Sequence, residues 1–110
     1  MSHVVKVKVA VSDETAFRAA ASRLNLEIPQ GTYPLLSVQF GDWLRAAQFD
    51  LKTGELSCDS DDQRYRQRSL DQFVQAYTVE RTRAVLRTQG ATMREAQQED
   101  GTIKLTAVFA

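Results

Sequence analysis

Apolar and polar residues alternate along residues 3–11 of the chain. Alternate positions between His3 and Val11 hold valine, and Lys6 and Lys8 stand between them. A period of two is that of a β-strand with one face on the core and the other in water. The first segment therefore predicts a half-buried strand.

Residues 14–24 change to a helical pattern. The side chain of Ser12 or Asp13 can accept hydrogen bonds from the free amide groups of a first turn. Asn25 is typical of the left-handed residue that ends a helix. Apolar residues three, four and seven positions apart draw one stripe along this helix. They are Phe17, Ala20, Ala21 and Leu24.

The middle of the chain predicts a β-meander. Leu36 and Phe40 share one face of a strand, and Gly41-Asp42 suits a two-residue hairpin turn. In that register Phe40 lies opposite Trp43, and Leu36 lies opposite Ala47. A second turn is expected at Thr53-Gly54, followed by a short third strand over residues 55–58.

Residues 69–89 predict the longest helix. Ser69 followed by Gln72 forms a capping box, in which two side chains bond free amide groups of the first turn. Val79 and Leu86 lie opposite the main apolar stripe, so either the helix bends near Thr78 or something covers a second face. The main stripe comprises Leu70, Phe73, Val74, Tyr77, Ala84 and Val85.

Residues 91–97 and 102–109 predict a hairpin that turns at Asp100-Gly101. A two-residue turn and a bulged three-residue turn both fit, so its register stays open. The element order is β-α-β-β-β-α-β-β over one domain of residues 1–110. We expect an α+β fold, with a small antiparallel or mixed sheet and two helices packed on one face.

Composition narrows the class of protein. The chain has 110 residues, 43% hydrophobic and 25% charged, with zero formal net charge. A balanced charge gives no general attraction to nucleic acid or membrane surfaces. The sequence contains no apolar run of the kind that predicts a membrane span or a secretion signal. Cys58 is the only cysteine, which fits a reducing compartment, so we expect a cytoplasmic protein.

The residue types predict no enzyme, metal site or cofactor. His3 is the only histidine, and proton transfer requires an oriented partner in a concave site. Cys58 precedes Asp59, and a neighbouring carboxylate raises a thiol pKa and weakens its nucleophilicity. Asp59, Asp61 and Asp62 lack the glycine and glutamate that an EF-hand loop requires. We therefore expect a non-enzymatic protein.

Arginine is concentrated between residues 64 and 94. Seven arginines stand there against Asp71 and Glu80, a local charge of +5 within a neutral chain. Guanidinium groups bind phosphate or carboxylate through paired hydrogen bonds, and Tyr65 could stack on a nucleobase. The arginines are spread around the helix. Two interpretations stay open: a solvated face with ion pairs, or a nucleic-acid surface.

Three stretches carry a family likeness. They are Met1-Ser2-His3, then Arg23-Leu24-Asn25-Leu26-Glu27, and then the run from Gln75-Ala76-Tyr77 through Gln89-Gly90 to Gln98-Glu99-Asp100-Gly101-Thr102-Ile103-Lys104-Leu105. In them the chain resembles the uncharacterised domain-of-unknown-function family 1257, the hypothetical chloroplast reading frame 35 family, found in cyanobacteria, plastids, other bacteria and phages. Members usually have glycine where Asn25 stands. The resemblance implies an AAA-type ATPase as a companion in bacteria, and it implies no catalytic residues.

Two functions are expected. The first is a small non-enzymatic protein-interaction or accessory module that binds a protein partner or a second copy of itself, because free sheet edges and a second apolar helix face favour docking. The alternative is a nucleic-acid-binding accessory protein that uses residues 64–94. The predicted interaction surface comprises Arg64, Tyr65, Arg66, Arg68, Val79, Arg83, Leu86 and Arg87.

Overall fold

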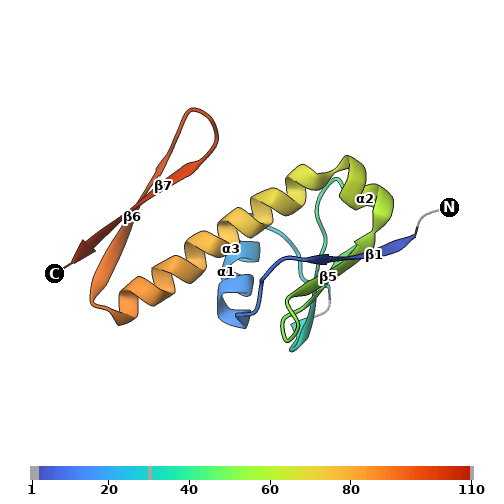
Figure 1. Cartoon of the computed structure of the whole chain (residues 1–110), viewed down its shortest axis with the longest axis horizontal. Helices are drawn as coiled ribbons and strands as arrows, with labels where there is room; N and C mark the ends of the chain where they lie inside the picture. The colour runs from blue at the N-terminus through green and yellow to red at the C-terminus, as the bar shows by residue number, and fades with distance from the viewer. Residues whose placement is uncertain (1–2, 30, 110) are drawn as a thin grey trace.

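The computed structural model describes residues 3–29 and 31–109, which form helices, a five-stranded sheet and a separate hairpin (Figure 1). The elements are β1 (Val4–Lys8), α1 (Glu14–Arg23), β2 (Gly31–Thr32), β3 (Leu35–Val38), β4 (Ala47–Asp50), β5 (Glu55–Asp59), α2 (Ser60–Tyr65), α3 (Gln67–Thr88), β6 (Ala91–Gln97) and β7 (Ile103–Phe109). Met1 and Ser2, which begin the family likeness, lie outside the described residues.

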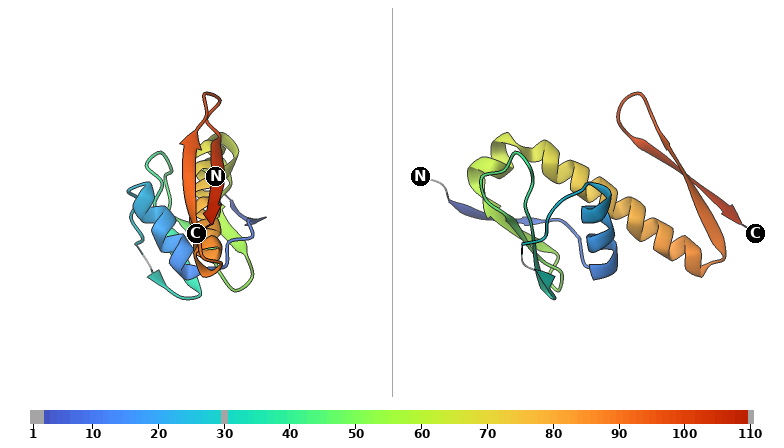
Figure 2. Two further views of the ribbon diagram at one scale, coloured as in Figure 1. Left: turned by 90° about the vertical axis from the view of Figure 1, so that its left-hand side faces the viewer. Right: turned by 180° about the vertical axis from the view of Figure 1, so that it is seen from behind.

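The main sheet has the strand order β1-β5-β4-β3-β2, and every pair is antiparallel. The predicted α+β fold with an antiparallel sheet is confirmed. The pattern did not predict the short elements β2 and α2. It also did not show that β6 and β7 form their own two-stranded sheet. The 22 residues of α3 span about 33 Å and carry the chain away from the main sheet, so the hairpin begins beyond it (Figures 1 and 2).

Three phenylalanines join α1 and α3 to one face of the sheet. The rings of Phe17 in α1 and Phe49 in β4 meet edge to face, with centroids 5.0 Å apart, and Phe17 meets Phe73 of α3 at the same distance. All three side chains are fully buried. Burial of such rings removes the largest apolar areas from water, so this cluster is the centre of the core.

α1 forms as the sequence predicts. Asp13 is its N-cap, and its carboxylate accepts a hydrogen bond from the Ala16 amide at 2.8 Å. Phe17 and the small residues of the predicted stripe are buried, and Asn25 has the left-handed φ of 57°. The small side chains of this stripe let α1 lie close to α3.

The predicted hairpin turn at Gly41-Asp42 is wrong. Leu36 pairs with Phe49 instead of Ala47, so β3 and β4 are joined by the longer loop 39–46. Within this loop Trp43 folds back on Phe40, with ring centroids 4.8 Å apart, and its indole N–H donates to the Arg66 carbonyl at 2.9 Å. Burial of the two rings against the start of α3 outweighs a tight turn.

The predicted capping box at Ser69 is also wrong. α3 begins earlier, at Gln67, directly after α2, and Asp59 caps α2 by accepting hydrogen bonds from two amides. The Ser69 hydroxyl instead donates to Asp42 at 2.5 Å, which ties α3 to the loop 39–46. A residue inside a helix has no free first-turn amide to cap.

Candidate interaction surfaces

The predicted interaction surface contains residues of three different kinds. Val79 is 3% exposed, so the prediction that it belongs to an exposed interaction surface is wrong. It lies one turn from Ala76 and Arg83 on the side of α3 that the β6–β7 hairpin covers. Of the two explanations for the second apolar face, a covering element is therefore the correct one. Leu86, on the same side, is half-buried.

Arg66 and Arg83 hold the fold together. Arg66 donates to the buried carboxylate of Asp62 at 3.1 Å. Arg83 pairs with Glu95 on the hairpin and, at 3.6 Å, with Glu80 on its own helix. Guanidinium groups already bound to carboxylates offer less charge to a phosphate group. Both residues are therefore structural in this fold.

The remaining four residues, Arg64, Tyr65, Arg68 and Arg87, are exposed. Arg64 lies over the ring of Tyr65 at 5.3 Å, a cation–π contact. The 19 residues from Arg68 to Arg87 along α3 separate them by about 28 Å. The exposed arginines of the predicted surface therefore lie apart, with Arg64 and Arg68 near the start of α3 and Arg87 near its end.

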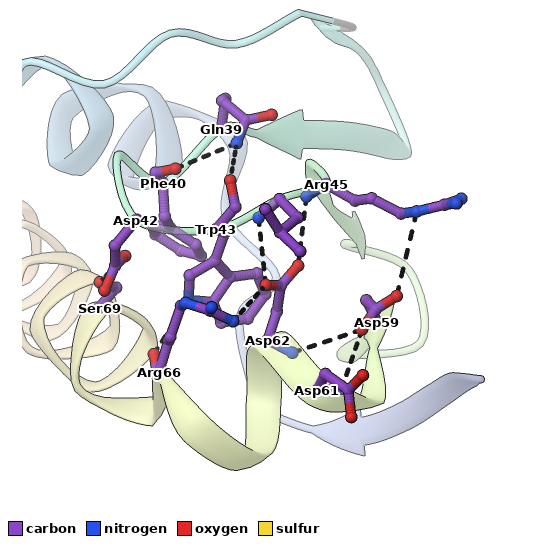
Figure 3. A network of polar contacts seen from close by, with 11 residues as sticks. Gln39, Phe40, Asp42, Trp43, Arg45, Asp59, Asp61, Asp62, Arg66 and Ser69 are labelled. Atoms are coloured by element: carbon purple, nitrogen blue, oxygen red, sulfur yellow. Dashed lines mark hydrogen bonds and ion pairs between the residues drawn. The ribbon is translucent and has the colours of Figure 1, made fainter. Parts of the chain in front are cut away.

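A buried carboxylate organises the end of the molecule that carries Trp43 (Figure 3). Asp62 is fully buried and accepts hydrogen bonds from the amides of Leu44 at 3.1 Å and Arg45 at 3.2 Å, and from Arg66. Among the residues described, no buried side-chain polar atom lacks a partner. Asp62 therefore fixes the loop 39–46 against α2.

His3 and Cys58 lie in different environments. His3 is exposed, and its backbone, not its imidazole, is bonded to Ser60. Cys58 is buried, and desolvation raises the pKa of its thiol, with further increases from Asp62 and Asp59. A raised pKa lowers the fraction of thiolate, which is the reactive form of the side chain. Residues 3–29 and 31–109 contain no group of three acidic, histidine or cysteine side chains placed to hold a metal ion.

The hairpin is fastened to the helices by ion pairs. Glu95 accepts a hydrogen bond from Arg23 of α1 at 2.9 Å and pairs with Arg83 of α3. The hydrogen bond from Arg23 is the main reason that the pKa of Glu95 is lowered. Ala91, at the start of β6, is buried. One carboxylate thus joins α1, α3 and β6.

The sequence predicted free sheet edges but did not reveal which strands have them, and β1 is one of these strands. In the described part of the chain β1 pairs with β5 alone. The Ser60 amide donates to the His3 carbonyl at 2.7 Å, and the Val9 amide donates to the Gly54 carbonyl at 2.9 Å. Hydrogen-bonded pairs alternate along an antiparallel ladder. The backbone groups that point away from β5 are therefore those of Val4, Lys6 and Lys8.

An apolar groove runs beside this edge, between β1 and α3. It has a volume of about 440 Å³. Val7 and Val9 form the apolar part of its strand side, and Leu70 and Val74 form that of its helix side; Asp71 of α3 also borders it. The Lys6 side chain is on the opposite face of β1 and is exposed, whereas the Lys8 ammonium group donates to the Thr53 carbonyl at 3.2 Å. Backbone groups, an apolar groove and a positive charge thus lie side by side.

Comparisons of the chain with family models, with curated proteins and with solved structures give no match. The resemblance to family 1257 and the companion ATPase that it implies stay predictions. No helix of the described residues is both long and apolar enough to cross a membrane.

Proposed function

We propose that this chain is a non-enzymatic protein-interaction module that adds an extended segment of a partner protein to the edge of β1. One observation carries the proposal: the outward backbone groups of Val4, Lys6 and Lys8 border the apolar groove between β1 and α3. An unpaired edge is a template for another strand, and the backbone bonds supply affinity while the groove supplies specificity.

The chemistry of the edge defines the partner segment. Side chains of an added strand alternate between the two faces of the sheet. Those on the helix side meet Val7 in the groove and are expected to be apolar. Those on the other side meet Lys6 and are expected to be acidic, because opposite charges on adjacent strands attract. The partner therefore presents a short strand in which apolar and acidic residues alternate.

A second copy of β1 does not fit this description. A register that pairs Val4, Lys6 and Lys8 with a second β1 places Lys6 directly opposite Lys6. Like charges in such a pair repel, and edge lysines are a common protection against pairing with copies of the same strand. The positive charge thus favours a different chain.

A peptide titration tests the proposal. The probe is a fluorescent eight-residue peptide in which valine alternates with glutamate, and the control replaces each glutamate with lysine. We expect the acidic peptide to bind about three- to tenfold more tightly, from the energy of cross-strand charge pairs. Lys6→Glu should reverse this preference. Absence of saturable binding, or equal binding of both peptides, would contradict the proposal.

Two proline variants separate the edge from the fold. The Lys6 amide points outward, so Lys6→Pro should keep the pairing with β5 and abolish peptide binding. The Val7 amide bonds to β5, so Val7→Pro should lower the melting temperature. If Lys6→Pro is folded and still binds the acidic peptide, strand addition at β1 is wrong.

The proposal includes the companion that the family resemblance implies. An AAA-type ATPase would be one source of the partner segment, and its surface strands or tails can be searched for the alternating apolar and acidic pattern. Purified ATPase should then compete with the acidic peptide for the wild-type chain. It should not bind the Lys6→Pro variant.

The alternative proposal, a nucleic-acid accessory protein, is supported by Tyr65. This side chain is 68% exposed and lies beside Arg64 at the end of α2, and Arg68 follows in the first turn of α3. An exposed aromatic ring beside a guanidinium group can stack on an unpaired base. Binding of a labelled single-stranded oligonucleotide should then weaken with salt and be lost in Tyr65→Ala. The matched control is Tyr33→Ala, since Tyr33 is 52% exposed and lies at the other end of the sheet.

A further inference from the structure

β7 is another strand with an unpaired edge. In the part of the chain that the structure describes, β7 pairs with β6 alone, and the hairpin lies at the end of α3 away from the main sheet (Figure 2). A two-stranded sheet is only marginally stable in water. α3 packs mainly on β6, so β7 is the less covered strand of the hairpin.

Hydrogen bonds near the turn show which backbone groups of β7 point outward. The Gln98 amide donates to the Thr102 carbonyl at 2.7 Å, so this pair bonds across the hairpin. By the alternation of an antiparallel ladder, Lys104, Thr106 and Val108 bond to β6 as well. The outward groups are those of Ile103, Leu105, Ala107 and Phe109.

These four residues form a set that is complementary to itself. A second β7 placed antiparallel, with a twofold axis at Thr106, pairs Ile103 with Phe109 and Leu105 with Ala107. Each apolar residue then meets an apolar residue. On the other face Thr106 meets Thr106, a favourable cross-strand pair, and Lys104 meets Val108. β7 contains one charged residue, and this register brings no like charges together.

Exposure at the end of the strand agrees with this pairing. Phe109 is 62% exposed and Val108 is 38% exposed. In the paired register the Phe109 ring of one copy lies on Ile103 of the other, which removes apolar surface from water. The lysines that protect β1 have no counterpart at the centre of β7.

We propose that two copies of this chain associate through β7 and form one continuous four-stranded antiparallel sheet, β6-β7-β7-β6, with the twofold axis at Thr106. The axis is perpendicular to the sheet, so both α3 helices lie on the same face. The inference uses a different strand from the proposed partner site. Either can therefore fail while the other stands.

Cysteine crosslinking tests the register. At the axis Thr106 forms a non-hydrogen-bonded pair with its copy, with Cα atoms about 4.5 Å apart, which suits a disulfide. Lys104 of one copy lies opposite Val108 of the other, and Val108 is four residues from the second Lys104. The two Lys104 Cα atoms are therefore about 14 Å apart. Thr106→Cys should form a covalent dimer under mild oxidation, and Lys104→Cys, on the same strand and face, should not. Wild type controls for the buried Cys58.

Light scattering across a wide range of protein concentration tests association itself. Wild type should change from monomer to dimer. Thr106→Glu should stay monomeric, because two carboxylates then meet at the axis. Within each hairpin Arg94 lies opposite the new glutamate, so the hairpin itself should keep its fold. Thr92→Glu, on the same face of β6, should dimerise like wild type. A wild type that is monomeric throughout, or a dimer in which Lys104→Cys crosslinks as fast as Thr106→Cys, would overturn the inference.

Discussion

Replacement of Asp62 by alanine should be the most damaging single polar change near the loop 39–46. The carboxylate is fully buried and holds three donors: the amides of Leu44 and Arg45 and the guanidinium group of Arg66. Alanine fills less space and accepts no hydrogen bond. The loop would lose its attachment to α2, and Trp43 would lose the support of its neighbours.

The size of the effect follows from the exposure of the three donors. Each backbone amide left without its acceptor costs about 1 kcal/mol or somewhat more, at the low end of the range because water can reach the exposed residues Leu44 and Arg45. The Arg66 side chain is 34% exposed, so its ion pair is screened and adds about 1 kcal/mol at most. We expect Asp62→Ala to lose about 2–4 kcal/mol of unfolding free energy.

Urea denaturation followed by Trp43 fluorescence and by circular dichroism measures this loss. Asp61→Ala is the matched control, since Asp61 neighbours Asp62 in α2 and is exposed; its removal should cost about 0.5 kcal/mol through the helix dipole. Asp62→Asn keeps the shape and one acceptor and should fall between the two. If Asp62→Ala and Asp61→Ala have the same stability, the buried carboxylate does not organise the loop.

Three further outcomes are expected. The pKa of Glu95 is lowered by its hydrogen bond with Arg23, so its contribution to stability is present above the ordinary pKa near 4.5 and is lost as the pH falls through the lowered value; Glu95→Gln should flatten the acid side of a curve of stability against pH, and an unchanged curve would contradict this role. Tyr77→Phe should cost about 1–3 kcal/mol, because the phenolic oxygen accepts hydrogen bonds from the amides of Ser12 and Asp13; Tyr65→Phe, at an exposed ring, should cost almost nothing, and equal losses in urea melts would refute the assignment. Burial and two carboxylates raise the pKa of Cys58, so a thiol-specific disulfide reagent should react far more slowly with the folded chain than with the urea-unfolded chain; equal rates would show an accessible thiolate.

Elements with a local cause could be predicted from the sequence. The valine alternation that gives β1, the Asp13 cap with the stripe of α1, and the Asp100-Gly101 turn of the hairpin each depend on residues within a few positions of one another. Gly101 has a φ of 90°, which glycine adopts without a steric cost. Such signals lie within a short window of the chain and need no tertiary partner.

The wrong predictions have non-local causes. The loop 39–46 is held by Asp62, 18 residues beyond Leu44, so the attractive turn residues Gly41-Asp42 are not used as a hairpin turn. The local pattern places Val79 on a second apolar face of α3. It does not show that this face is covered, because the hairpin that covers it comes later in the chain. Likewise, the alternation of valine and lysine gave the faces of β1 but not its place at the sheet edge. Strand order is set by the whole fold.

Amide hydrogen exchange with and without the acidic valine–glutamate peptide tests whether a partner segment binds to the edge of β1. The amides of Lys6 and Lys8 point outward in the free chain, so the peptide should slow their exchange strongly. The amides of Val5 and Val7 already bond to β5 and should change little. Protection confined to α3 or to the hairpin, with Lys6 and Lys8 unaffected, would contradict strand addition at this edge.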